Sequence, residues 1–152
     1  MNTHTTRRTV LKSTGAMATL LSLGIVTAEQ AQAAGRAGFD AKNLQDAIKA
    51  LGGSVSANDQ VQIISPDIAE NGAVVPVGAI SRIPNTTEIY LLVEKNPVPM
   101  AAAFMIPAGT EPDVQTRLKM GQSTDVVAIV KADGKLYSAT KETKVTLGGC
   151  GG

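Results

Sequence analysis

The sequence predicts a mainly β protein: an antiparallel β-sandwich preceded by one short helix. From Gln60 onward, short runs rich in valine and isoleucine alternate with glycine, proline, asparagine and aspartate, which is typical of strands separated by turns. One stretch before these runs has apolar residues at helical spacing. Short strands at regular intervals, without alternating helices, favour two packed antiparallel sheets over an α/β fold.

The helix is expected between Phe39 and Leu51, where apolar residues recur every three or four positions. Asp40 is a suitable cap for its beginning, and Gly52-Gly53 is a typical end. A helix this short is marginal in isolation, so we expect it to pack on another part of the domain. Its apolar positions are Leu44, Ala47, Ile48 and Leu51.

Eight strands are expected after the helix. Asp133-Gly134, between two of them, is a typical hairpin turn. A sandwich leaves sheet edges that must be blunted or covered, and the apolar stretch from Pro99 to Ile106 is one that a partner chain could cover. The strands are expected near Gln60–Ser65, Val75–Ser81, Thr87–Glu94, Ala101–Ile106, Val114–Met120, Thr124–Lys131, Lys135–Thr140 and Thr143–Leu147.

Residues 1–33 are predicted to form a twin-arginine signal peptide. Arg7 and Arg8 stand in the order Thr-Arg-Arg-Thr-Val-Leu-Lys, and a weakly apolar stretch follows them. The small-x-small pattern Ala-Gln-Ala then predicts cleavage after Ala33. The apolar stretch is shorter than the about 20 residues of a membrane-spanning helix, so no membrane anchor is expected. An ordinary Sec signal is the alternative.

The composition of the mature chain, residues 34–152, excludes several function classes. Losing the leader removes three of the 14 basic residues and one of the 13 acidic residues, which leaves 11 against 12. A near-neutral domain without a basic run does not attract nucleic acid or an anionic membrane. The one histidine, His4, lies in the leader. We therefore expect no catalytic residues, no metal site and no resident cofactor.

The chain ends in Leu-Gly-Gly-Cys-Gly-Gly, and Cys150 is its one cysteine. The alternating run before these glycines predicts a last strand. Residues 148–152 predict a flexible arm, because glycine has the widest backbone freedom. At about 3.3–3.6 Å per extended residue, an arm that begins at Leu147 carries the thiol roughly 10 Å from the sandwich.

The arm cysteine is expected to carry cargo for other enzymes. With an ordinary pKa of about 8.5, only a few per cent of a thiol is thiolate at neutral pH, which suits a handle that is activated inside other active sites. A disulfide-linked dimer is the simpler alternative, although it needs no flanking glycines. The expected roles are covalent attachment at Cys150, a hinge at Gly148 and Gly149, and a slim tip at Gly151 and Gly152.

This ending, the strand Lys144-Val145-Thr146-Leu147 before it and the twin-arginine leader resemble the SoxY family of sulfur-substrate carriers in bacterial thiosulfate oxidation. The terminal Gly-Gly-Cys-Gly-Gly is the most specific part of the resemblance, and the middle of the chain is generic. The resemblance implies an immunoglobulin-like sandwich over residues 34–147, a carrier arm over residues 148–152 and a periplasmic location.

The resemblance also implies partners and chemistry. A SoxZ-like subunit would pair tightly with the chain, as a heterodimer or higher assembly. A SoxXA-like haem enzyme would join thiosulfate oxidatively to Cys150, and a SoxB-like manganese hydrolase would release sulfate and leave a persulfide. A SoxCD-like molybdenum dehydrogenase, where the organism has one, would oxidise the outer sulfur.

Two other function classes remain open from the sequence. The terminal Gly-Gly is also found in ubiquitin-like sulfur carriers, in which the carboxylate of Gly152 would become a thiocarboxylate. A copper-handling module would use soft sulfur ligands from Met100, Met105, Met120 and Cys150.

Three basic residues could contact an anionic cargo group on the arm. They are Arg82, Arg117 and Lys119, and charge is the sole argument for them.

Overall fold

The computed structural model describes residue 36 and residues 38–146. The chain divides after residue 36, and the sandwich belongs to the part from residue 37 onward. The predicted leader, with Arg7, Arg8 and the cleavage point after Ala33, lies outside the described residues, as does the arm of residues 148–152 with Cys150.

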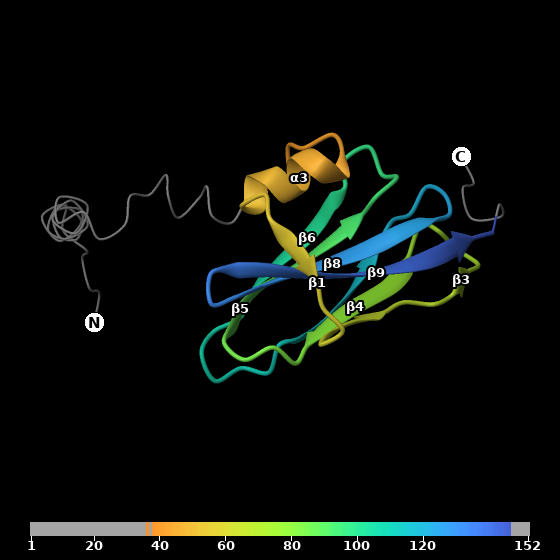
Figure 1. The fold of residues 1–152 in the computed structure, drawn as a ribbon. Helices are drawn as coiled ribbons and strands as arrows, with labels where there is room; N and C mark the ends of the chain where they lie inside the picture. The colour runs from red at the N-terminus through yellow and green to blue at the C-terminus, as the bar shows by residue number, and fades with distance from the viewer. Residues whose placement is uncertain (1–35, 37, 147–152) are drawn as a thin grey trace, which may run out of the picture. The chain divides into compact units, whose positions relative to one another are not determined.

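Two sheets form the sandwich (Figure 1). The large sheet has the strand order β1-β9-β8-β5-β6, with β3 paired to β9 outside this path, and the small sheet has the order β2-β4-β7. The strands are β1 (Val55–Ala57), β2 (Val61–Ile64), β3 (Ile68–Ala69), β4 (Val75–Ser81), β5 (Thr86–Val93), β6 (Met100–Met105), β7 (Asp113–Leu118), β8 (Thr124–Ala132) and β9 (Lys135–Val145).

Both faces of the large sheet are covered. Between the two sheets lies an apolar core that contains Val77, Ile89 and Val130. On the other face, the helix α3 (Leu44–Leu51) packs on a second cluster around Tyr90 and Ile129. Figure 1 shows α3 and β4 on opposite sides of the large sheet. In β8, and in β5 from Ile89 onward, nearly every residue is therefore buried, instead of the alternation of a half-exposed strand.

The helix confirms the predicted face and end but begins later than predicted. Its N-cap is Asn43, whose side-chain oxygen accepts from the backbone N–H of Asp46 at 2.9 Å while its amide donates to the Asp46 carboxylate at 2.7 Å. This reciprocal pair resembles a capping box and outcompetes Asp40, which lies in a turn. Gly52, with φ of 134°, ends the helix as expected.

Six of the eight predicted strands are confirmed within two residues at each end. The last two are one continuous strand, because Lys141 and Glu142 keep the ladder with β8 intact across the predicted gap. The sandwich is also not purely antiparallel. The very short strands β1 and β3, which were not predicted, both pair with β9 in the parallel direction.

The Asp133-Gly134 hairpin is confirmed between β8 and β9. Both residues have positive φ, 48° and 73°, as a type I′ turn requires. The Asn85 side chain donates to the Asp133 carboxylate at 3.1 Å and ties this hairpin to the turn before β5. The hairpin fixes the start of β9 at one end of the sheet, so its last residue, Val145, lies at the opposite end.

Candidate functional site

The strand β9 leads directly to the predicted arm. We call Lys144 and Val145, the last two residues of β9, together with Thr146 the arm root, because Thr146 is the last described residue before Cys150. The arm root is where the sandwich ends and any movement of the arm would start. The hydrogen bonds of the arm root therefore decide after which residue the arm could begin to move.

The segment around β3 holds the arm root on one side. The backbone N–H of Lys144 donates to the carbonyl of Asp67 at 2.9 Å, and that of Thr146 donates to the carbonyl of Ala69 at 3.1 Å. The Thr146 hydroxyl donates to the carbonyl of Glu70 at 3.3 Å. These bonds extend the sheet by one residue beyond Val145.

Ser123 holds the arm root on the other side. The ladder between β8 and β9 ends where Thr124 faces Thr143. Beyond that point, the Ser123 hydroxyl accepts from the backbone N–H of Val145 at 2.9 Å and donates to its carbonyl at 3.4 Å. The Ser123 hydroxyl thus takes the place of a backbone partner from β8. Both the N–H and the carbonyl of Val145 are therefore hydrogen-bonded.

Gly72 closes the packing beneath the arm root. The backbone N–H of Met120 donates to the carbonyl of Gly72 at 2.7 Å. A Cβ at Gly72 would lie 2.4 Å from the carbonyl oxygen of Met120 and 2.8 Å from Cγ1 of Val145. The segment after β3, the end of β7 and the end of β9 therefore meet at a point that has room for glycine alone.

A polar cluster just before the arm root joins β9 to Ser65 at the end of β2. Thr143 is fully buried, and its hydroxyl bonds that of Ser65 at 3.1 Å. Lys141 donates to the carbonyl of Ser65 at 2.6 Å and pairs with the exposed carboxylate of Asp67 at 3.1 Å. The hydrogen bonds matter more here, since an ion pair with so exposed a partner contributes little.

Ser123→Ala is expected to loosen the arm root without unfolding the domain. It removes the acceptor for the Val145 amide and costs about 1 kcal/mol locally. We expect amide hydrogen exchange at Val145 to accelerate several-fold, measured by NMR, while the melting temperature changes little. Thr146→Val is the matched control, because it removes only an exposed hydroxyl bond. Unchanged exchange at Val145 in Ser123→Ala would contradict this role.

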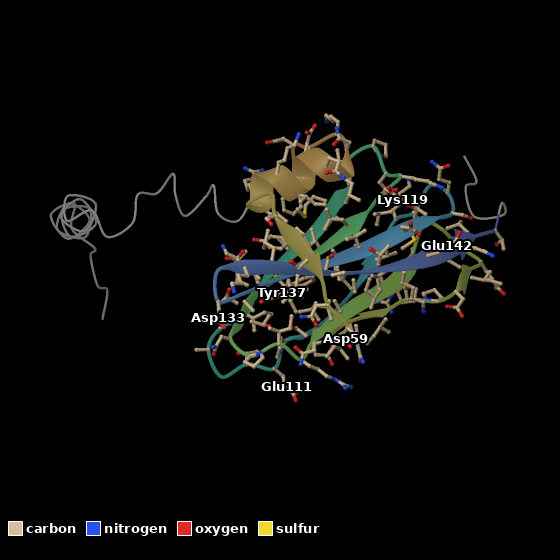
Figure 2. All side chains as sticks on the ribbon, viewed as in Figure 1. Asp59, Glu111, Lys119, Asp133, Tyr137 and Glu142 are labelled. Carbon is tan, nitrogen blue, oxygen red and sulfur yellow. The ribbon has the colours of Figure 1, made fainter. Side chains whose placement is uncertain are left out.

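The structure separates the three basic residues considered for the cargo. Lys119 follows β7, and Asn96 donates to its carbonyl at 2.8 Å at the end of the sandwich where β9 finishes. Figure 2 shows Lys119 and Glu142 at that end and Asp133 at the opposite one. Arg117 faces Pro76 near the start of β4, also toward the arm root. Arg82 lies beyond the other end of β4, against Gln60, and is remote from the arm root.

The methionines considered for copper do not converge. Met100 is buried in the cluster under α3, Met120 is buried between the sheets, and Met105 is 49% exposed at the end of β6. No group of three or more His, Cys, Asp or Glu that could hold a metal ion occurs among residues 38–146.

One titratable cluster lies away from the arm root, on the helix-covered face of the large sheet. Burial, together with the hydrogen bond to the Glu88 carboxylate, raises the pKa of Tyr90 far above its ordinary value. Lys131 pairs with the same carboxylate at 3.1 Å. The three side chains satisfy one another's polar groups at the rim of the apolar core. They face no cavity at the arm root.

Two surface hollows are prominent, and both lie away from the arm root. One, of about 490 Å³, is lined by Arg82, Asn85 and Thr110 among others, and the other, of about 460 Å³, lies between the end of α3 and the β8–β9 hairpin. Within the described part of the chain, no helix has the length and apolarity needed to cross a membrane.

Sequence reasoning missed the residues that hold the arm root. Ser123 and Gly72 lie in connections between strands, and neither belongs to a motif. A two-residue strand such as β3 has no periodicity from which to predict it. The signal available in the sequence was that the last predicted strand ends directly before the arm. This implied that other residues must hold the end of that strand.

The sequence matches the family described as "Sulfur oxidation protein SoxY" over residues 48–150. Among solved structures, the chain is similar to the sulfur carrier protein SoxY from Chlorobium limicola f thiosulfatophilum, with 41% sequence identity and a TM-score of 0.63. That match covers 69% of this chain and 97% of the other.

A second similar structure is a superoxide reductase (neelaredoxin) from Ignicoccus hospitalis, with 27% identity and a TM-score of 0.51, over 57% of this chain and 80% of the other. No curated protein matches the chain at the significance required.

Proposed function

This chain belongs to the SoxY family of sulfur oxidation proteins, a family of sulfur carriers, and we propose that it is the periplasmic substrate carrier of thiosulfate oxidation, with its cargo on Cys150. The observation that carries the proposal is the family match, which extends through residue 150 and so includes the cysteine. The firmly held arm root supports it, because a carrier needs a fixed point from which its arm departs.

The proposed arm begins after Thr146. Cys150 is the fourth residue after Thr146, so an extended arm carries the thiol at most about 14 Å beyond the last held residue. Gly148 and Gly149 would act as the hinge, and Gly151 and Gly152 would keep the tip slim. The thiol can then enter an active-site channel of a partner enzyme while the sandwich stays outside.

The SoxY family is a carrier family, so the chemistry on Cys150 would belong to partner enzymes. A SoxXA-like haem enzyme would couple the thiol with thiosulfate into a cysteine S-thiosulfonate, taking two electrons and releasing the thiol proton. A SoxB-like hydrolase would add water across the terminal sulfur–sulfur bond, which releases sulfate and leaves a persulfide. A SoxCD-like dehydrogenase would oxidise that outer sulfur, and hydrolysis would return the thiol.

The proposal includes export and a partner subunit. The leader, with Arg7 and Arg8, would direct the chain through the twin-arginine pathway, which carries folded proteins, and cleavage would follow Ala33. A SoxZ-like subunit would associate with the sandwich. Both expectations rest on the sequence and on family membership.

Gly149→Val is expected to slow thiosulfate loading while leaving the fold intact. A β-branched residue restricts the backbone of the hinge and adds bulk next to the cysteine. The loading rate is measured by intact mass after incubation with thiosulfate, the SoxZ-like subunit and the haem enzyme. Gly121→Val is the control, because a Cβ at Gly121 meets no atom within 4 Å. Loading of Gly149→Val at the wild-type rate would refute the hinge.

A further inference from the structure

The connection from β3 to β4 lies beside the arm root. Its residues 68–74, which we call the collar, start against the end of β9 and cross to the small sheet, where β4 begins (Figure 1). Ile68 lies directly beside Lys144 in the parallel pairing of β3 with β9. Gly72, in the middle of the crossing, lies against Val145. The collar is therefore part of the surface around the arm root.

The two most exposed large apolar side chains of the described residues both belong to the collar. Ile68 is 60% exposed and Val74 is 52% exposed, whereas Ala69 between them is buried. Single exposed aliphatic residues need no explanation, but two on one short segment form a candidate interaction surface. Glu70 and Lys144, which border them, are exposed and opposite in charge. The surface therefore favours an apolar partner over an acidic or a basic one.

Hydrogen bonds hold the collar in one conformation. Three of its carbonyls accept from the arm root and from Met120, as described above. Within the collar, the side-chain oxygen of Asn71 accepts from the backbone N–H of Ala73 at 2.9 Å, and the carbonyl of Asn71 accepts from that of Val74 at 3.4 Å. A surface fixed in this way loses little conformational freedom when a partner binds to it.

The distance along the chain from Thr146 to Cys150 limits where an enzyme can lie. An enzyme that holds the Cys150 thiol in its active site must come within about 14 Å of the arm root. Part of that distance is taken up inside the enzyme, so the mouth of its active-site channel comes closer still. The collar is an exposed apolar surface within that zone.

We propose that, given the carrier function proposed above, the collar is the surface on which an enzyme that acts on Cys150 docks, through an apolar rim at the mouth of its channel. Ile68 and Val74 bury their exposed carbon atoms against the rim while the arm enters the channel, and this burial favours association. Two aliphatic side chains make a small contact. A small contact suits a carrier that must leave one enzyme for the next.

The first test measures the loading rate against carrier concentration, with thiosulfate, the SoxZ-like subunit and the SoxXA-like haem enzyme. Ile68→Ser is expected to raise the KM for the carrier about tenfold and to leave kcat unchanged, because it removes docking and not chemistry. Val74→Ser should act in the same direction. Met105→Ser is the matched control, because it removes a comparably exposed side chain near the β8–β9 hairpin end. An unchanged KM in both collar variants would overturn the proposal.

The second test separates docking from effects on the arm. Alkylation of Cys150 by iodoacetamide needs no docking, so its rate, followed by intact mass, should be the same in Ile68→Ser and the wild-type protein. A changed rate would place the effect of Ile68→Ser in the arm and overturn the proposal. If circular dichroism shows that Ile68→Ser is unfolded, Val74→Ser, which lies outside any strand, decides alone.

A SoxZ-like subunit and a second copy of this chain are the alternative occupants of the collar. Light scattering after size-exclusion chromatography measures both associations. If Ile68→Ser weakens either one, the collar belongs to that interface and the docking proposal is wrong. A wild-type carrier that is not loaded at all would refute the proposed function. A carrier that loads, with the same KM in the collar variants, would refute the docking proposal alone.

Discussion

Cys150→Ser is expected to abolish thiosulfate loading completely while leaving the sandwich unchanged. A hydroxyl cannot form the sulfur–sulfur bond of an S-thiosulfonate, and the chain has no second cysteine to replace it. Loading is measured as the mass of one bound thiosulfate group after incubation with thiosulfate, the SoxZ-like subunit and the SoxXA-like haem enzyme.

Gly121→Ala is the control for Cys150→Ser, because it changes a position where a Cβ meets no atom within 4 Å and leaves the whole arm intact. It should load. An adduct of the same mass on Cys150→Ser would show that the cargo sits elsewhere, and a sulfur found on the carboxylate of Gly152 would favour the ubiquitin-like alternative.

Gly72→Ala is expected to destabilise the domain by about 3 kcal/mol, which lowers the melting temperature on the order of 10 °C. Its Cβ would approach the Met120 carbonyl oxygen to 2.4 Å, and that oxygen belongs to the backbone, which cannot swing aside as a side chain would. Relief requires the segment after β3 to separate from Met120, which also withdraws support from Val145. Thermal unfolding followed by circular dichroism measures the change.

Gly121→Ala provides the comparison for Gly72→Ala. The two glycines lie in the same part of the fold, yet a Cβ at Gly121 has open space around it. We expect the melting temperature of Gly121→Ala to differ little from that of the wild-type protein. If Gly72→Ala is as stable as Gly121→Ala, the close packing beneath the arm root is not a constraint on the fold.

The strands were predictable because local chemistry defines them. In β5 and β8, most residues are β-branched or aliphatic, and the strands stand between turns rich in glycine, proline and asparagine. Asp133-Gly134 specifies its hairpin through backbone conformation alone, since both residues adopt positive φ. These signals act within a few residues of sequence, and six strands follow from them within two residues at each end.

The arm root was not predictable because its contacts join residues far apart in the sequence. Ser123 and Val145 are 22 residues apart, and Thr146 and Glu70 are 76 apart. Nothing near Ser123 distinguishes it from other loop serines until β9 is placed beside it. The helix start was mispredicted for a related reason: Asn43 competes with Asp40 through its pairing with Asp46.

Cys150 was identified by a different kind of reasoning. Its importance came from composition, since a single thiol between glycine pairs at the end of a chain without mature histidine has few other uses. Such a thiol is typical of a carrier, but the identity of its cargo is implied only by family membership.

The central claim is that Cys150 carries sulfur in the native protein. The most direct test is the intact mass of the mature protein isolated from its native periplasm, with and without reductant, followed by peptide mapping. The account predicts a sulfur or thiosulfate adduct on the peptide that contains Cys150, removed by reductant. A bare thiol under conditions of active thiosulfate oxidation, or a homodimeric disulfide as the sole modification, would contradict it.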